Sequence, residues 1–198
     1  MRTRTRAAVV GLSLTGTLLL AAGSATGHGS PHLPVSRQVL CADGAVQDCG
    51  PIQWEPQSVE GPKGFPLRGP ADGTICSGGN SRFAQLDDPR GGTWPATAVT
   101  AGERYTFSWR LTAPHATEDF RYYLTKPGYD PARPLTRSAL ETRPFLTVPF
   151  GGARPGTTVT HTGTLPSGRT GKQLIVGVWT IADTENAFYA CSDVRFPG

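Results

Sequence analysis

The run RYTFSWRL, residues 104–111, alternates between two kinds of side chain. From Tyr105 to Leu111 every second residue is aromatic or aliphatic, and the residues between them are Thr, Ser and Arg. Successive side chains of a strand point to opposite faces, so this pattern is typical of a β-strand with one buried face. The run therefore predicts a strand of a sheet that covers a core, with Trp109 on the core side.

Further runs resemble strands, and 25 Gly and 18 Pro residues punctuate the chain between them. The run QLIVGVWTIA (173–182) is nearly all apolar, as expected of a central strand, and we expect Trp179 in the core. In TTVTHTGTL (157–165), His161 lies among β-branched residues, and we expect it to be an exposed strand residue. The other candidate strands are DFRYYLTK (119–126) and FYACSDVRF (188–196), and only PLTRSAL (134–140) suggests a short helix. This pattern predicts an all-β chain, folded as an antiparallel β-sandwich of the immunoglobulin or fibronectin-III type.

The stretch from His28 to about Pro95 is different, because it is long, rich in Gly and Pro, and poor in periodicity. Within it, WEPQSVEGPKGFPLRGPADG (54–73) shows no convincing element. A loop of this length inside a compact domain is usually functional or disordered, and the cysteines in and beside it favour an ordered, loop-rich insertion. The sequence shows neither an internal repeat nor a linker, so we expect residues 28–198 to form a single domain.

Residues 1–27 have the three-part order of a secretory signal peptide. A basic start is followed by the apolar run 7–22, and Ala25 and Gly27 then put small residues at positions −3 and −1 of a cut before His28. A cut after Ala25 would compete with it and leave Thr26 first. The apolar run is too short and too interrupted for a comfortable membrane span, and no second one follows. We therefore expect a secreted protein with no membrane partner.

The formal net charge of +4 belongs mostly to this leader. Its arginines, Arg2, Arg4 and Arg6, are opposed by no acidic residue there, so subtracting their 3 charges from +4 leaves +1 for the rest of the chain. A basic chain would suggest nucleic acid as a partner. The remaining Lys and Arg residues are scattered, and we expect no nucleic-acid partner.

The chain has 4 cysteines, an even number that predicts disulfides in an exported protein. Three pairings are possible. We favour Cys41–Cys49, which closes a short loop, and by remainder Cys76–Cys191, which would tie an early loop to the last strand. The spacings contain no paired C-x-x-C, which argues against a zinc site.

A histidine at a new N-terminus would have metal-binding chemistry that an internal histidine lacks. The α-amine of His28, with an ordinary pKa of about 8, and its ring nitrogen Nδ1 could bind one ion together, because a metal can displace the amine proton at neutral pH. With a second imidazole the set would comprise three nitrogens, which suits copper(II). Taken alone, His28 is better explained as an ordinary solvated residue, because many mature proteins begin with an arbitrary residue. The hydrolase motifs GxSxG and HExxH do not occur.

A series of blocks carries a more specific pattern. They are HGSPHLPVSR (28–37), WEPQSVEGPKGFP (54–66), GPADG (69–73), TAPHAT (112–117), YYLTKPGYDP (122–131), PLTR (134–137) and VWTIADTENAFYACSDV (178–194). In this order they resemble the bacterial lytic polysaccharide monooxygenases, specifically the chitin-active type once called chitin-binding proteins. The resemblance covers essentially all of residues 28–198.

This resemblance implies a copper site. His28 would bind copper through its amine and a ring nitrogen, and His115 would supply the second imidazole. Ala113 would crowd one axial face of the copper, and Phe188 would occupy the other axial side without binding it. Glu60 would lie near the copper and help to position oxygen or peroxide.

The resemblance also implies a flat face that binds polysaccharide. Trp54 would be the exposed aromatic residue of this face, although from the sequence alone Trp54 and Phe188 could each pack in the core instead. The polar residues of the face would be Glu55, Glu60, Thr112, Asp183 and Asn186.

Two residues near these blocks stand apart. Glu185 departs from the family pattern, in which small residues are common at this position. His32 lies between Pro31 and Pro34, where a regular helix is disfavoured, and no matched block makes it a ligand.

The resemblance implies a secreted, monomeric copper monooxygenase that cleaves crystalline chitin by oxidation at C1. An external reductant and either O2 or H2O2 would be its co-substrates. The choice of chitin over cellulose rests mainly on the block WEPQSVEG. A cellulose-active monooxygenase, a non-catalytic chitin-binding protein and an exported copper carrier are the alternatives.

Overall fold

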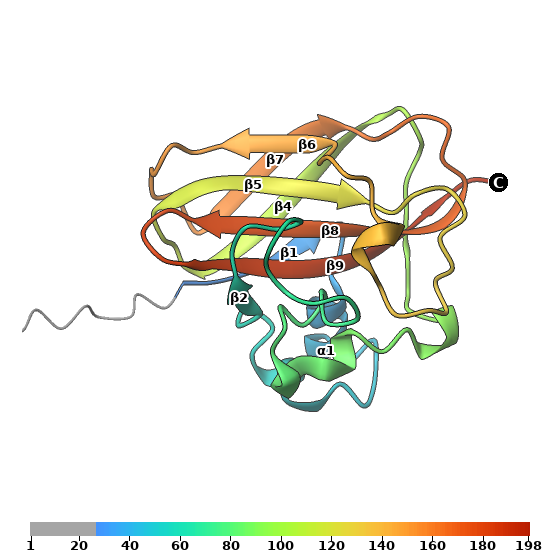
Figure 1. Ribbon diagram of the computed structural model, residues 1–198, viewed down its shortest axis with the longest axis horizontal. Helices are drawn as coiled ribbons and strands as arrows, with labels where there is room; N and C mark the ends of the chain where they lie inside the picture. Colours follow the sequence, from blue (N-terminus) through green and yellow to red (C-terminus); the bar gives the residue numbers. More distant parts are fainter. Residues whose placement is uncertain (1–26) are drawn as a thin grey trace, which may run out of the picture.

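The computed structural model describes residues 27–198, so all of the predicted signal peptide except Gly27 lies outside the described residues. Residues 27–198 form two β-sheets that pack face to face as a sandwich (Figure 1). The three-stranded sheet has the order β1 (His28–Leu33), β4 (Arg104–Ala113), β7 (Thr158–Thr164). The six-stranded sheet has the order β2 (Glu60–Pro62), β9 (Asn186–Phe196), β8 (Gly171–Ile181), β5 (Thr117–Leu124), β6 (Leu146–Pro149), and β3 (Thr97–Ala98) pairs with β9. The predicted antiparallel sandwich is confirmed, with the short parallel pair β3–β9 as an addition.

The central strand β8 is buried on both faces, which explains its nearly unbroken apolar run. Leu174, Val176 and Val178 pack into a core between the six-stranded sheet and the insertion, which we call the outer core. Trp179 and Ile181 pack into a second core between the two sheets, which we call the inner core. The side chains of β8 thus point to both of its faces, some into the outer core and some into the inner core.

The inner core is built from aromatic residues of both sheets. Trp109 of β4 and Trp179 of β8 are fully buried, as predicted, with ring centroids 6.4 Å apart. Phe120 stacks on Trp179 at 5.8 Å, and Phe188 lies 4.9 Å from Trp179. This layer leads from the middle of the sandwich to the beginning of β9.

His161 corrects the prediction of an exposed strand residue, since only 5% of its surface is exposed. On β7 the threonines at 158, 160 and 162 face outward, so Val159 and His161 take the inner face. His161 Nδ1 lies 2.8 Å from the hydroxyl of Tyr122, which accepts a hydrogen bond of 3.0 Å from Trp109 Nε1. Burial lowers the pKa of His161 to about 4, so the ring is neutral at neutral pH.

The insertion contains more regular structure than the sequence predicted. It begins with β1, continues into α1 (Arg37–Ala42), and contains 3-10 turns such as Gly50–Trp54. By contrast, the helix expected over 134–140 is reduced to one 3-10 turn, Arg137–Ala139. In the described part of the chain, no helix is long and apolar enough to cross a membrane.

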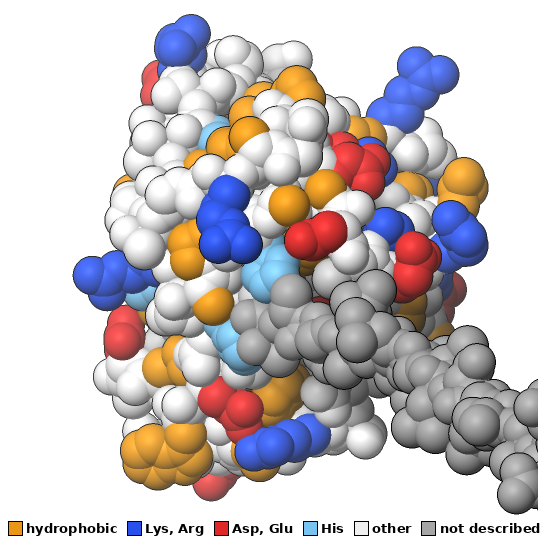
Figure 2. Space-filling model, turned by 90° about the vertical axis from the view of Figure 1, so that its left-hand side faces the viewer, with side chains coloured by type: hydrophobic (Ala, Val, Ile, Leu, Met, Phe, Trp, Pro, Cys, Tyr) orange, Lys and Arg blue, Asp and Glu red, His pale blue; other side chains and the backbone are white. Residues whose placement is uncertain are grey.

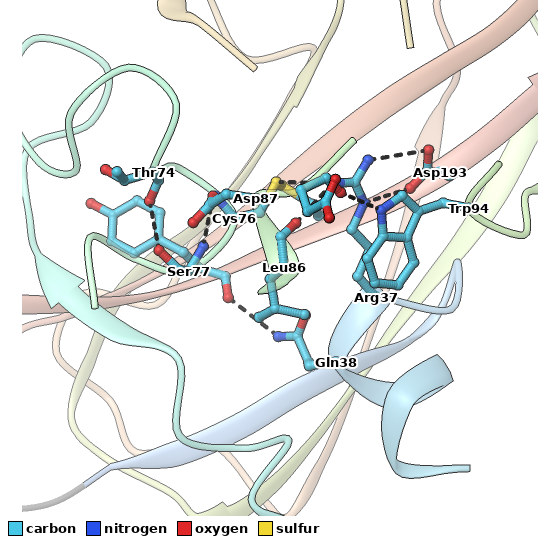
Figure 3. Close-up of a disulfide and its surroundings, with 12 residues drawn as sticks. Arg37, Gln38, Thr74, Cys76, Ser77, Leu86, Asp87, Trp94 and Asp193 are labelled. Atoms are coloured by element: carbon cyan, nitrogen blue, oxygen red, sulfur yellow. Dashed lines mark hydrogen bonds and ion pairs between the residues drawn. A yellow bond between two sulfur atoms is a disulfide. The ribbon is translucent and has the colours of Figure 1, made fainter. Parts of the chain in front are cut away.

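Crosslinks attach the insertion to the sheet (Figure 3). Cys76 forms a disulfide with Cys191 of β9, and Cys41 pairs with Cys49, which is the connectivity favoured above. Arg37 Nε donates a 2.7 Å hydrogen bond to Asp193 of β9, with both side chains buried. The Arg37 guanidinium also lies 4.8 Å from the ring centroid of Trp94. A segment with few ladder hydrogen bonds is thus held by covalent, ionic and cation–π contacts.

Candidate functional site

Several of the predicted site residues meet at one end of the sandwich. His28 begins β1 and pairs with Ala113, the last residue of β4. The turn 182–185 between β8 and β9 lies at the same end, at the left of Figure 1. Glu60 of β2 pairs with Phe188 of β9 just beyond that turn. Figure 2 looks onto this end and shows histidine side chains at the surface, with acidic side chains around them.

One contact to its ring and one to its main-chain carbonyl hold His115 in place. Its Nδ1 lies 3.4 Å from Asp183 Oδ1, and only 6% of the residue is exposed. Its carbonyl oxygen accepts a 2.9 Å hydrogen bond from Thr117 Oγ1, which in turn accepts one of 2.8 Å from Trp179 Nε1. A carboxylate at Nδ1 favours the proton at that nitrogen and leaves the lone pair at Nε2, the arrangement common for metal-ligating histidines.

The close approach of β1 to the inner core positions His28. A Cβ at Gly29 would lie 2.5 Å from Leu111 Cδ2 and 3.1 Å from Trp179 Cζ3, so a larger residue here would force the buried Leu111 side chain to move. His28 itself is half-buried, and its ring centroid lies 6.4 Å from that of Phe188. The site therefore begins where the inner core ends.

Gly27, the last residue before the predicted cut, lies against the same rings. A Cβ built on Gly27 would be 2.9 Å from Phe188 Cε2 and 3.1 Å from His115 Cδ2. In the uncleaved chain the residue before His28 therefore occupies the space beside His115.

Glu60 and Asn186 form the second hydrogen-bonded pair of this end. Asn186 Nδ2 donates a 2.7 Å hydrogen bond to Glu60 Oε1. Both residues are partly buried, and they lie at opposite ends of the paired register of β2 and β9, in which Glu60 pairs with Phe188 and Asn186 with Pro62. The sheet pairing thus sets the position of the Glu60 carboxylate.

Trp54 lies on the surface, with 80% of it exposed, so it does not cap the core. It ends the 3-10 turn Gly50–Trp54, and the next residue, Glu55, forms an ion pair with Arg82. The loop that follows contacts the start of β1 through a 3.0 Å hydrogen bond from the Gly29 amide to the Gln57 carbonyl. Thr112 is also exposed, and its hydroxyl lies 3.5 Å from the carbonyl oxygen of His28.

Phe188 combines the two roles considered for it. Only 1% of it is exposed, and it packs on Trp179 in the inner core. The same ring faces His28 and Gly27 at the end of the sandwich. It therefore closes the core and borders the site.

The remaining histidines lie elsewhere. His32 is four residues along β1 from His28, or ~13 Å at the rise of a strand. Burial and the nearby Arg110 charge lower the pKa of His32. His161 faces the inner core, as described above. Neither belongs to the group around His115.

The sequence did not single out Lys63 or Thr117. Thr117 contacts the main chain of His115, and Lys63 contacts the main chain of the 182–185 turn. Each was visible only as a member of a block, Thr117 as the last residue of TAPHAT and Lys63 within WEPQSVEGPKGFP, and neither was assigned a role. Lys63 donates from Nζ to the Thr184 carbonyl at 2.5 Å. It reaches the 182–185 turn from the insertion.

The comparisons identify relatives over nearly all of the described chain. Residues 28–194 match the family described as "Lytic polysaccharide mono-oxygenase, cellulose-degrading". GlcNAc-binding protein A of Shewanella oneidensis is 42% identical over 192 residues, which are 97% of this chain and 40% of that protein. The chain thus spans about two fifths of the length of that relative.

Solved structures agree with this match. An AA10 lytic polysaccharide monooxygenase from Streptomyces lividans is 60% identical, with a TM-score of 0.84 over 85% of this chain and 100% of that one. The CBM33 protein of Bacillus amyloliquefaciens, solved in complex with Cu(I), is 40% identical, with a TM-score of 0.78 over 85% and 99% of the two chains.

Proposed function

This chain belongs to the lytic polysaccharide monooxygenases, a family of copper-dependent oxidoreductases, and from that premise we propose that it cleaves crystalline chitin by oxidation at C1. The proposal assumes a secreted, monomeric protein whose first residue is His28. The observation that carries it is the contact between Asp183 and His115 Nδ1, at the end of the sandwich where β1 begins. That contact presents the other ring nitrogen of His115 for a metal.

The residues at this end fit a copper ion. His28 would contribute its amine and Nδ1, and His115 would contribute Nε2, a set of three nitrogens that suits copper(II). Among residues 27–198, no group of three or more His, Cys, Asp or Glu side chains lies in a metal-binding arrangement. The proposed set needs no third side chain, because one ligand is a main-chain amine.

The contacts of Gly27 support a site that is created by cleavage. Residue 27 lies against both His115 and Phe188. Removal of the leader before His28 would clear this space and expose the amine beside the His115 ring.

A copper ion held by His28 and His115 would supply the redox chemistry for hydroxylation of C1, either with O2, two electrons from an external reductant and two protons, or with H2O2, and water would be the second product in both cases. The chain's own residues would support this in separate ways. Asn186 donates a hydrogen bond to Oε1 of Glu60. We propose that the other carboxylate oxygen, Oε2, holds and transfers a proton. Phe188 would exclude water from one side of the site, and Ala113 would limit access from another.

The exposed Trp54 supports binding of a polysaccharide surface. An indole with 80% exposure offers an apolar face on which a sugar ring can stack. Glu55, Thr112, Asp183 and Asn186 would supply hydrogen bonds around it. Chitin is a polymer of GlcNAc, and the name of the Shewanella relative supports chitin, whereas the family description names cellulose.

The test is oxidation of crystalline polysaccharide by protein that starts at His28. We expect incubation with chitin, copper and ascorbate to release oligosaccharides with oxidised C1 ends, detected by mass spectrometry. Cellulose incubated in parallel tests the choice of substrate. Oxidised products from neither polysaccharide would contradict the proposal.

A matched control separates the enzyme from a non-catalytic chitin-binding protein. The control is the same chain with one extra residue before His28, which blocks the amine. We expect it to bind chitin through Trp54 but to release no oxidised products. Equal products from both forms would show that the amine is not a copper ligand.

A further inference from the structure

Lys63 connects the insertion to the β8–β9 turn through three contacts. Its amide donates a 3.0 Å hydrogen bond to the Glu185 carbonyl, and its Nζ donates one of 2.5 Å to the Thr184 carbonyl. Nζ also lies 3.7 Å from Glu185 Oε1. Backbone and side chain of a single residue thus hold two consecutive residues of the turn.

The turn and the first residue of β9 carry the two polar partners of the site. Asp183, just before the two clamped residues, contacts His115 Nδ1 at 3.4 Å. Asn186, just after them, donates to Glu60 Oε1 at 2.7 Å. The Asn186 amide also donates a 3.2 Å hydrogen bond to Thr184 Oγ1. A shift of Thr184 would therefore move both Asp183 and Asn186.

Of the two side-chain contacts of Lys63, the hydrogen bond to the Thr184 carbonyl is stronger than the ion pair with Glu185. The Lys63 side chain is only 22% exposed, and a hydrogen bond from a cation is roughly twice as strong as one between neutral groups. The Glu185 side chain is 93% exposed, so its ion pair with Lys63 contributes little. The 2.8 Å hydrogen bond from the Ala182 amide to the Ala116 carbonyl holds the first residue of the turn and leaves residues 184 and 185 to the contacts with Lys63 and Asn186.

We propose that Lys63 is a positioning residue of the metal site. Its ammonium group fixes the β8–β9 turn, so that Asp183 faces His115 and Asn186 faces Glu60. This inference rests on the proposed copper site, because its consequence is the orientation of the His115 ring. Glu185, the residue that departs from the family pattern, is a minor partner of the same clamp.

The test compares Lys63→Met, which keeps the length of the side chain without a donor, with Lys63→Arg, which keeps a cationic donor. Glu185→Gln is the matched control, because it removes only the exposed ion pair. All forms start at His28. Copper affinity is measured by titration calorimetry and the Cu(II) environment by electron paramagnetic resonance, and neither readout depends on turnover.

We expect Lys63→Met to raise the copper dissociation constant about threefold to tenfold, less than the ~10–100-fold typical of a group that touches the ligand itself. The Cu(II) spectrum should change in the same variant. Lys63→Arg should restore both, and Glu185→Gln should leave both unchanged. A purely structural role would lower the melting temperature without changing the spectrum.

The outcomes separate the two proposals. A native chain that binds no copper overturns the proposed copper site and this inference with it. A native chain that binds copper while Lys63→Met matches it in affinity and spectrum overturns the inference alone. If Lys63→Met does not fold, Lys63→Gln replaces it with the same expected loss, since its shorter neutral amide cannot reproduce the cationic contact.

Discussion

The inner and outer cores are held together by different physical means. In the inner core, aromatic rings pack continuously from Phe120 through Trp179 to Phe188 and end beside His28. The outer core lies beneath an insertion with little ladder pairing, and the Cys76–Cys191 disulfide and the Arg37–Asp193 ion pair fasten it to β9.

The two cores position different sets of residues. His28 begins β1, and His115 lies in the short connection between β4 and β5, so the packing of these strands sets the positions of the proposed copper ligands. Trp54 and Glu60 belong to the insertion, so the crosslinks of the outer core hold the residues proposed to meet the polysaccharide. Loss of packing in the inner core should therefore shift the proposed copper ligands, and loss of the crosslinks should release the part of the insertion that carries Trp54 and Glu60.

The largest effect should come from His115→Ala, which removes a proposed ligand at the edge of the inner core. We expect the copper dissociation constant to rise by more than about 100-fold, since loss of an outer partner alone costs ~10–100-fold. Titration calorimetry measures it, and His32→Ala is the matched control with native affinity. Native-like copper binding by His115→Ala would show that the ligand lies elsewhere.

Removal of a crosslink should destabilise the outer core according to the loop that it closes. Replacing both Cys76 and Cys191 by Ser opens a loop with a sequence separation of 115, at an expected cost of ~5 kcal/mol in the free energy of unfolding. The same change at Cys41 and Cys49, with a separation of 8, should cost ~2.5 kcal/mol. Denaturant unfolding measures both, and the reverse order would contradict the loop-entropy account.

Acid should weaken the inner core through His161. Burial lowers its pKa in the folded state to about 4, below the ~6.5 of an unfolded chain. The unfolded chain therefore binds the extra proton between these values, and His161 stabilises fully above about pH 6.5 and loses that contribution as the pH falls toward 4. The expected loss is about 3 kcal/mol, at 1.36 kcal/mol per pH unit.

His161→Leu isolates this contribution. Urea unfolding at pH 7 and pH 4.5 gives the pH dependence of the free energy of unfolding for the native chain and for the variant. Titration of the carboxylates contributes to this dependence in both forms, so the difference between the forms reports His161. We expect a flatter dependence for the variant, even though its stability at pH 7 falls because Tyr122 loses a partner. An equal dependence in both forms would mean that His161 does not titrate in this range.

The smallest effect should come from Trp54→Ala, which should leave both cores intact. We expect binding to chitin to weaken about tenfold, or ~1.4 kcal/mol. The melting temperature and the copper affinity should not change, because the side chain is 80% exposed. Leu67→Ala, another exposed apolar residue of the insertion at 94%, is the control expected to bind normally.

Much of the sheet structure followed from local patterns. Alternation in 104–111 predicted β4, which is buried on one face, and the apolar run 173–182 predicted the central strand β8, which is buried on both. The spacing of apolar residues along a strand shows which of its faces are buried. The same reasoning misplaced His161, since the hydrophilic threonines around it are the outward residues and its own side chain faces Tyr122. It also missed β1, whose residues HGSPHL have no strand pattern and pair with β4 through tertiary contact.

The candidate site was accessible from the sequence only as blocks that resemble a family. His28, Glu60, His115 and Asp183 lie far apart along the chain, and no periodicity relates them. Lys63 belongs to one of these blocks, but its role could not be found, because it comes from the carbonyl groups of a turn more than a hundred residues away.

Local pattern and ordered motifs are enough to predict the five longest strands (β4, β5, β7, β8 and β9), the family and the residue types available for copper. They do not predict that Asp183 contacts His115, that Asn186 contacts Glu60, or that Lys63 holds the turn between them, which are properties of the folded chain. The reason is physical. Hydrogen bonds between distant residues depend on how two sheets and an insertion pack, and packing brings together atoms that no local pattern connects.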